Sequence, residues 1–176
     1  MQNFAGTVNA DVAVTTDISP QMDIEIPTLR AAIKIEGDSL VLLDADTFKM
    51  LSKWLFFKNK KHNMIDHMAV EVTVENSVLE IYPFMFDIDR YRLGVMGSND
   101  LAMNMNYHVS VLKSPVPFKF GINIKGTPDD FKIRLGGAKF KDNMVGERQA
   151  IADNTRVNIV QQIDNVFRRG IAKARR

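Results

Sequence analysis

The sequence predicts a mainly β protein: a large twisted antiparallel sheet, as a half-pipe or open sandwich, with a short helix near 46–58 and a C-terminal amphipathic helix. Three observations predict this class. Apolar and polar residues alternate with a period of two over most of the chain up to residue 135. Short turn-forming sequences separate these runs, as in an antiparallel meander. From about residue 145, apolar residues recur at intervals of three and four, as on one face of a helix.

The first alternating run covers Thr7–Ile18, where even positions are mostly apolar and odd positions mostly polar. This pattern indicates a strand with one buried face. Pro20 and Pro27 punctuate the next extended stretch, which favours an edge or a bend. The short helix near 46–58 is predicted from apolar residues at helical spacing and from a basic stretch that suits a helix C-terminus. The apolar residues of this helix are Phe48, Leu51, Trp54 and Leu55.

The clearest strand signal lies in two later runs. Odd positions are apolar or aromatic over Leu101–Val111, and even positions are apolar over Val116–Ile124. Gly97–Asp100, just before the first run, has the composition of a turn. We therefore predict an apolar sheet face built mainly by these two strands. Its candidate groove residues are Leu101, Met103, Met105, Val109, Val111, Phe118, Phe120, Ile122 and Ile124.

An apolar sheet face of this size must be covered, since each large apolar side chain removed from water contributes about 1.5–3 kcal/mol. Three coverings are possible: a second sheet, the two predicted helices, or an apolar ligand. A closed sandwich core is the commoner solution for such patterns. Incomplete coverage would leave a strip suited to acyl chains, and the flexible side chains of Met103 and Met105 fit such a surface.

Residues with catalytic or metal-binding potential form no convincing pattern. The chain has no cysteine, which excludes disulfides and thiolate chemistry. His62 and His67 are not at a zinc-binding spacing, and His108 is expected at the surface on the polar side of a strand. Asp87 and Asp89 could form an acid/base pair, but salt bridges to the nearby arginines are the simpler interpretation. We predict no enzymatic activity, no catalytic residue, no metal and no cofactor.

The charge distribution limits the classes of partner. The formal net charge of the 176-residue chain is only +2, and its aromatic residues lie in apolar strand faces, so nucleic-acid binding is disfavoured. Basic residues gather at the C-terminus, and no acid occurs among the last nine residues. This cluster suits either phosphates and anionic lipid headgroups or a solvated helix C-terminus.

The stretch from about residue 37 to residue 142 resembles the C-terminal region of AsmA-like envelope proteins in the form found in Bacteroidetes. The resemblance covers about 100 of the 176 residues and depends on the order and spacing of short motifs rather than on any one of them. These motifs are Leu40–Phe48, Asn63–Asp66, Gly97–Tyr107, Lys113–Phe118 and Gly126–Asp130.

Membership of this family would imply a periplasmic protein that is tethered to the inner membrane by an N-terminal helix. Proteins of the AsmA, TamB and YhdP type take part in outer-membrane assembly and are similar in having an apolar sheet surface for phospholipid passage between membranes. No catalytic residues are known for the family. Since this chain contains no such anchor, we expect it to be the terminal part of a longer envelope protein, which would be its main partner.

The sequence thus predicts a β-rich AsmA-like domain over 1–142 and a basic amphipathic helix over 143–176 that packs on it or extends from it. The expected function is that of a non-enzymatic envelope module whose apolar groove binds phospholipid or another acyl-chain ligand. The alternative is a closed β-sandwich that serves as a structural or protein-interaction domain and has no lipid ligand.

Overall fold

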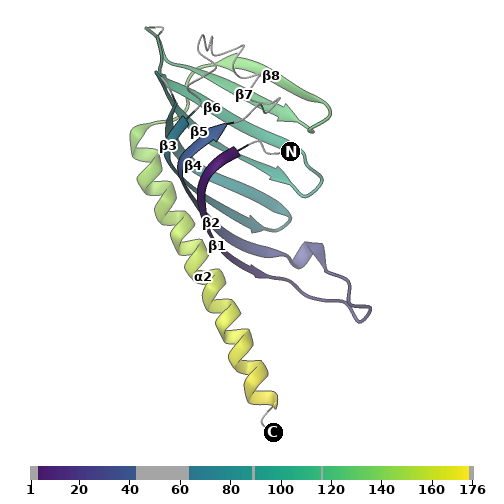
Figure 1. Ribbon diagram of the computed structural model, residues 1–176. Coiled ribbons are helices and arrows are strands. Elements are labelled where there is room, and N and C mark those ends of the chain that lie inside the picture. Colours follow the sequence, from purple (N-terminus) through teal and green to yellow (C-terminus); the bar gives the residue numbers. More distant parts are fainter. Residues whose placement is uncertain (1–3, 43–63, 89, 116, 175–176) are drawn as a thin grey trace.

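The computed structural model describes residues 4–42, 64–88, 90–115 and 117–174, which form one antiparallel sheet and one long helix (Figure 1). The helix expected near 46–58 lies outside the described residues. The strands are β1 (Phe4–Thr15), β2 (Arg30–Leu42), β3 (Met64–Glu75), β4 (Val78–Ile88), β5 (Tyr91–Asp100), β6 (Met105–Lys113), β7 (Phe120–Gly126) and β8 (Phe131–Gly136). The helices are η1 (Ile26–Thr28), a single 3-10 turn, and α2 (Asp142–Ala174).

The eight strands follow one another across the sheet in sequence order, and every neighbouring pair is antiparallel. Strands β1 and β8 therefore form the two edges of a single open, uncurled layer (Figure 1). A meander of this kind needs only short connections, because each strand begins where the previous one ends. The prediction of a large antiparallel sheet with a C-terminal helix is confirmed.

The register keeps apolar side chains on one face of the sheet from edge to edge, because directly paired residues point to the same side. A register shift in β4 is essential to this arrangement. It lies between Ile81, which pairs with Gly97, and Phe84, which pairs with Val95. The extra residue in β4 brings Ile81 and Phe84 to the same face although their numbers differ by three. We call this side of the sheet the apolar face and the opposite side the polar face.

Gly97–Asp100 was predicted to form a turn, and this prediction is wrong because the segment is the end of strand β5. Gly97 is required there by a close approach between strands: a Cβ at this position would lie 2.7 Å from the Asn106 carbonyl oxygen. The turn follows at residues 101–104. Asp100 closes it by accepting hydrogen bonds from the backbone nitrogen and side-chain amide of Asn104, at 2.8 and 2.7 Å.

Helix α2 crosses the polar face of the sheet over strands β1 to β4 and continues beyond it (Figure 1). Ile159 is its one fully buried apolar residue among those whose side chains are described. Phe140, in the connection before the helix, packs on Gly94 of β5, where a Cβ would lie 2.6 Å from the phenyl ring. Small residues on the polar face thus let this connection approach the sheet closely.

Candidate functional site

The apolar face is the candidate functional site, and its centre is a buried cluster. The cluster draws on strands β3 to β7 and consists of Ile65, Ile88, Tyr91, Leu93, Val109, Val111 and Ile122. Half-buried side chains pack against it, including Phe120, Ile124 and Ile133. This packing gives the middle of the sheet a rigid apolar layer.

The candidate groove residues divide into two groups. Val109, Val111 and Ile122 are buried, and Phe120, Ile124 and Met105 are half-buried on the same face. Leu101, Met103 and Phe118 are exposed and lie outside the strands. The predicted strand Leu101–Val111 begins only at Met105, because the chain turns over residues 101–104 with Met103 in the left-handed region at φ 65°. The structure therefore brings six of the nine residues together on one sheet face.

The open part of the apolar face lies at edge strand β1, which was not among the candidate groove residues. Val8, Val12 and Val14 are 54%, 60% and 49% exposed. Their partners on β2 are Gly37, Ile33 and Ala31, so they continue the face that leads to the buried cluster. The alternation in Thr7–Ile18 correctly indicates a strand with one apolar face, but the strand ends at Thr15 and that face is exposed rather than buried. Its place at the edge, which leaves the valines exposed, depends on the order of strands in the sheet.

The polar face carries a network around Ser110, which is fully buried. The Ser110 hydroxyl oxygen accepts hydrogen bonds from the backbone nitrogens of Lys139 and Phe140, at 3.1 and 3.0 Å. Because both lone pairs are then used, the hydroxyl proton is left for His108 Nε2, at 2.9 Å. His108 Nδ1 in turn donates to the Asn123 side-chain oxygen at 2.9 Å, which also accepts from Lys139 Nζ at 3.0 Å.

This network ties the connection before α2 to strands β6 and β7. His108, expected at the surface, is only 5% exposed, because that connection folds over the polar side of its strand. A serine, a histidine and an amide in a row resemble a hydrolytic triad. The Ser110 oxygen, however, is buried and fully hydrogen-bonded, so it serves here as a structural acceptor for backbone groups.

His108 makes the stability of the fold depend on pH. Burial lowers the pKa of His108, the nearby Lys139 ammonium lowers it further, and the Asn123 hydrogen bond opposes both. The unfolded chain therefore binds a proton more readily than the folded one near the ordinary histidine pKa of about 6.5. We expect the contribution of His108 to be complete above that pH and to decline as the pH falls from about 6.5 toward the lowered folded pKa.

Urea unfolding at several values between pH 5 and pH 7.5 measures this dependence. The His108→Gln variant should show a flatter dependence on pH than the wild type. A His67→Gln variant is the matched control, because His67 lies exposed in an ion pair with Asp38 on the same face. Equal slopes in the wild type and the His108→Gln variant would contradict the assignment.

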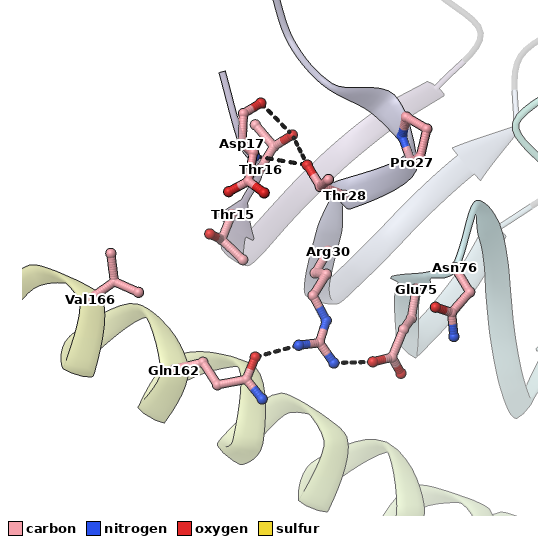
Figure 2. Close-up of a pocket in the computed structure, with 10 residues that line it drawn as sticks. All are labelled: Thr15, Thr16, Asp17, Pro27, Thr28, Arg30, Glu75, Asn76, Gln162 and Val166. Carbon is pink, nitrogen blue, oxygen red and sulfur yellow. Dashed lines mark hydrogen bonds and ion pairs between the residues drawn. The ribbon is translucent and has the colours of Figure 1, made fainter. Parts of the chain in front are cut away.

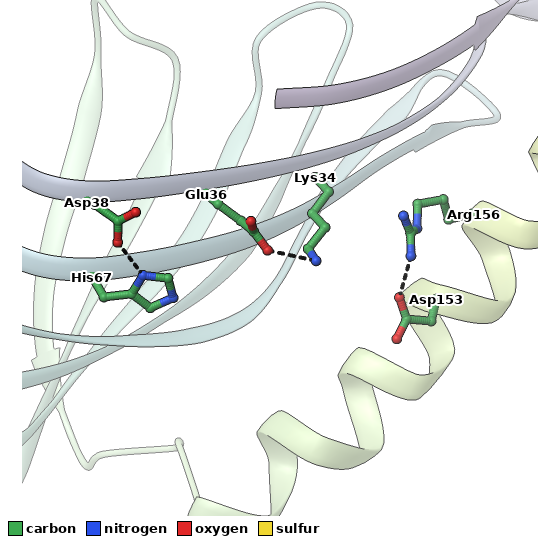
Figure 3. A network of polar contacts seen from close by, with 6 residues as sticks. All are labelled: Lys34, Glu36, Asp38, His67, Asp153 and Arg156. Atoms are coloured by element: carbon green, nitrogen blue, oxygen red, sulfur yellow. Dashed lines mark hydrogen bonds and ion pairs between the residues drawn. The ribbon is translucent and has the colours of Figure 1, made fainter. Parts of the chain in front are cut away.

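A hydrogen bond joins α2 to the polar face, and ion pairs within the sheet and within the helix flank the contact. Arg30 of β2 bonds both Glu75 of β3 and Gln162 of the helix, at the edge of a pocket of about 410 Å³ (Figure 2). Farther along the face, Lys34 pairs with Glu36 at 2.7 Å, next to the helix pair Arg156 and Asp153 at 3.1 Å (Figure 3). The helix lies over these polar residues, so it covers the polar face and not the apolar one.

Glu71 reports the burial at this helix contact. Burial raises the pKa of Glu71, and the nearby Arg156 guanidinium partly opposes this by lowering it.

Because α2 lies on the polar face, it is not the covering of the apolar face that the sequence called for. The strands that the structure describes all belong to one sheet.

Other candidate residues have structural partners. Asp87 forms a two-point ion pair with Arg92, with both nitrogen–oxygen distances at 2.8 Å, and this hydrogen bonding lowers the pKa of Asp87. The salt-bridge interpretation of this acid is confirmed, whereas Asp89 and His62 lie outside the described residues. Within the described ranges, no three acidic or histidine side chains come together as a metal site.

None of the helices described in the structure has the length and apolar character needed to cross a membrane. Comparisons with protein-family models, with curated proteins and with solved structures find no match to this chain.

Proposed function

We propose that the chain is a non-enzymatic lipid-handling module whose apolar sheet face binds acyl chains. The observation that carries the proposal is the exposure of Val8, Val12 and Val14 on the same face as the buried cluster. An apolar surface that continues from a packed core to an open edge is suited to a ligand without hydrogen-bonding groups.

The difference in coverage between the two faces of the sheet supports this proposal. Helix α2 lies on the polar face, where Gln162 bonds Arg30 and Ile159 is buried, and the valines of β1 remain exposed. Ile33 and Ile35 of β2 lie between these valines and the buried Val70 and Val72 of β3, so apolar side chains form an uninterrupted path. An acyl chain lying across β1 and β2 would touch such side chains along its length.

The setting that we propose follows from the resemblance of residues 37–142 to AsmA-like proteins. In that setting the chain belongs to a longer, inner-membrane-anchored protein of the bacterial periplasm and takes part in outer-membrane assembly or phospholipid transport. Its partners are phospholipid, or another acyl-chain ligand, and the remainder of the longer protein.

Binding of a fluorescent phospholipid analogue to the purified protein tests the proposal. The change is Val12→Glu, which places a charge on the open apolar face. Because Val12 is already 60% exposed, the charge stays hydrated in the free protein and the fold should persist. Binding should weaken about tenfold or more, since a bound acyl chain would strip water from the carboxylate.

The matched control is Asn9→Glu, on the same strand but on the opposite face, which should bind like the wild type. Lipid extraction and native mass spectrometry of the wild type should also find co-purified phospholipid. A lipid-stripped protein that binds no analogue, or equal binding by the two glutamate variants, would instead favour a structural or protein-interaction domain.

A further inference from the structure

The C-terminal end of α2 projects past the sheet (Figure 1). In the part of the chain that the structure describes, no hydrogen bond or ion pair joins the helix to the sheet beyond Gln162. We call residues 160–174 the terminal segment. At about 1.5 Å per residue it is roughly 22 Å long.

The terminal segment exposes large apolar side chains on one side. Phe167 is 71% exposed, and Val160 and Ile171 are each nearly half exposed. These residues are separated by seven and four positions, a spacing that places them on one helix face. Val166, 65% exposed, lies about 100° around the helix from Phe167, on the side that lines the pocket shared with β1. A helix face of this kind without a partner is unusual for a surface in water.

Cations accompany this apolar face. Arg168 and Arg169 are exposed, and the sequence continues with Lys173, Arg175 and Arg176, while the segment contains a single acid, Asp164. Asp164 pairs with Arg168 at 2.7 Å, so the segment keeps a clear excess of positive charge. A second copy of this chain would bring the same excess, and the repulsion would oppose pairing of two terminal segments.

We propose that the terminal segment docks on the surface of an anionic phospholipid bilayer. The helix lies along the interface with Phe167 and Ile171 inserted among the acyl chains. The arginines and Lys173 reach the phosphate groups, because their long apolar stems can lie along the boundary while their charged ends stay in water. The positive charge of the terminal segment and its exposed apolar face thus both favour an anionic bilayer as the partner. This inference is independent of ligand binding by the apolar sheet face.

Co-sedimentation with vesicles tests the proposal. The full chain should bind vesicles of phosphatidylcholine with 30% phosphatidylglycerol, should bind pure phosphatidylcholine vesicles much less, and should release from the anionic vesicles in about 0.5 M NaCl. The double variant Arg168→Gln/Arg169→Gln should bind about 30-fold more weakly, since each cation near an anionic surface contributes about 1 kcal/mol. Lys132→Gln/Arg134→Gln on β8, with the same change in charge, should bind like the wild type.

A matched pair of variants tests how much the apolar side chains contribute to vesicle binding. Phe167→Ser should weaken vesicle binding about tenfold or more. Ile151→Ser, which changes a half-exposed residue nearer the start of the same helix, should not. The chain has no cysteine, so a single Ile171→Cys variant can carry an environment-sensitive dye without other changes. Its emission should shift to the blue on anionic vesicles, while a dye at an Ile151→Cys variant should not respond.

Three results would overturn the proposal: equal binding by the two charge variants, equal binding to neutral and anionic vesicles, and self-association through the terminal segment without vesicle binding. The Val12→Glu variant separates this proposal from lipid binding by the sheet. It should keep vesicle binding even though it loses the fluorescent phospholipid analogue.

Discussion

Replacing Ile122 with alanine should lower the free energy of unfolding by about 2–5 kcal/mol, the usual cost of removing a fully buried isoleucine side chain. Ile122 has no exposed surface and sits between Val109 of β6 and Leu135 of β8 on the apolar face. Truncation would leave a cavity in the middle of the buried cluster, where strands on both sides hold the backbone in place. Urea unfolding followed by circular dichroism measures the change as a lower midpoint with an unchanged slope.

The control for this prediction is Leu135→Ala. Leu135 is the direct cross-strand partner of Ile122 on the same face, but it is 57% exposed because β8 is an edge strand. Its truncation should cost less than about 1 kcal/mol, because the side chain already lies largely in water. Similar losses for the two variants would mean that the apolar face is not packed most tightly at its centre.

Replacing Ser110 with alanine should lower the free energy of unfolding by about 2–4 kcal/mol. The hydroxyl oxygen is the acceptor for two backbone N–H groups, those of Lys139 and Phe140, and the donor to His108 Nε2. Each buried polar group that loses its partner costs about 1–3 kcal/mol, and water does not easily reach a site with no exposed surface. Equilibrium unfolding measures the loss, and hydrogen exchange at the Lys139 and Phe140 amides should become faster.

Ser98→Ala is the matched control, because Ser98 of β5 lies on the same face of the sheet as Ser110 and pairs with Asn106 of β6. This variant should unfold within about 0.5 kcal/mol of the wild type, the range of ordinary surface substitutions. If Ser110→Ala were equally mild, the connection before α2 would have to be held mainly by Phe140 against Gly94 and not by the serine.

Ile122 and Ser110 lie on opposite faces of one sheet, and the two faces are stabilised in different ways. The apolar face is held by packing of side chains that carry no titratable group in the buried cluster other than the phenol of Tyr91. The polar face is held by hydrogen bonds and ion pairs that depend on the charge of His108 and on the residues opposite α2. Lowering the pH through the range in which His108 gains a proton should therefore loosen the connection before α2 before it disturbs the apolar face. Both proposed lipid contacts, on β1 and on the terminal segment, lie outside the most tightly packed parts.

Much of the fold could be predicted from the sequence, because alternation and helical spacing are local properties of the chain. Six of the nine candidate groove residues lie together on the apolar face, and α2 spans nearly the predicted range. Of the three misplaced residues, Leu101 and Met103 lie in a turn held by Asp100 and Asn104, and Phe118 lies just before β7 begins at Phe120. Gly97 shows the same limit, since a glycine required by close strand packing cannot be distinguished from a turn glycine by sequence alone.

The sequence by itself determined that the strands are one-sided and that the last helix is basic and amphipathic. Only the tertiary structure decided what lies on each side. The bulge between Ile81 and Phe84 keeps the apolar residues on one face, and the strand order leaves the valines of β1 exposed at an edge. The helix lies on the polar face, where Gln162 bonds Arg30, Ile159 is buried and the Arg156 guanidinium acts on the Glu71 carboxylate. Pairing register, edge position and charge matching between distant segments are nonlocal, so no single stretch of residues contains them.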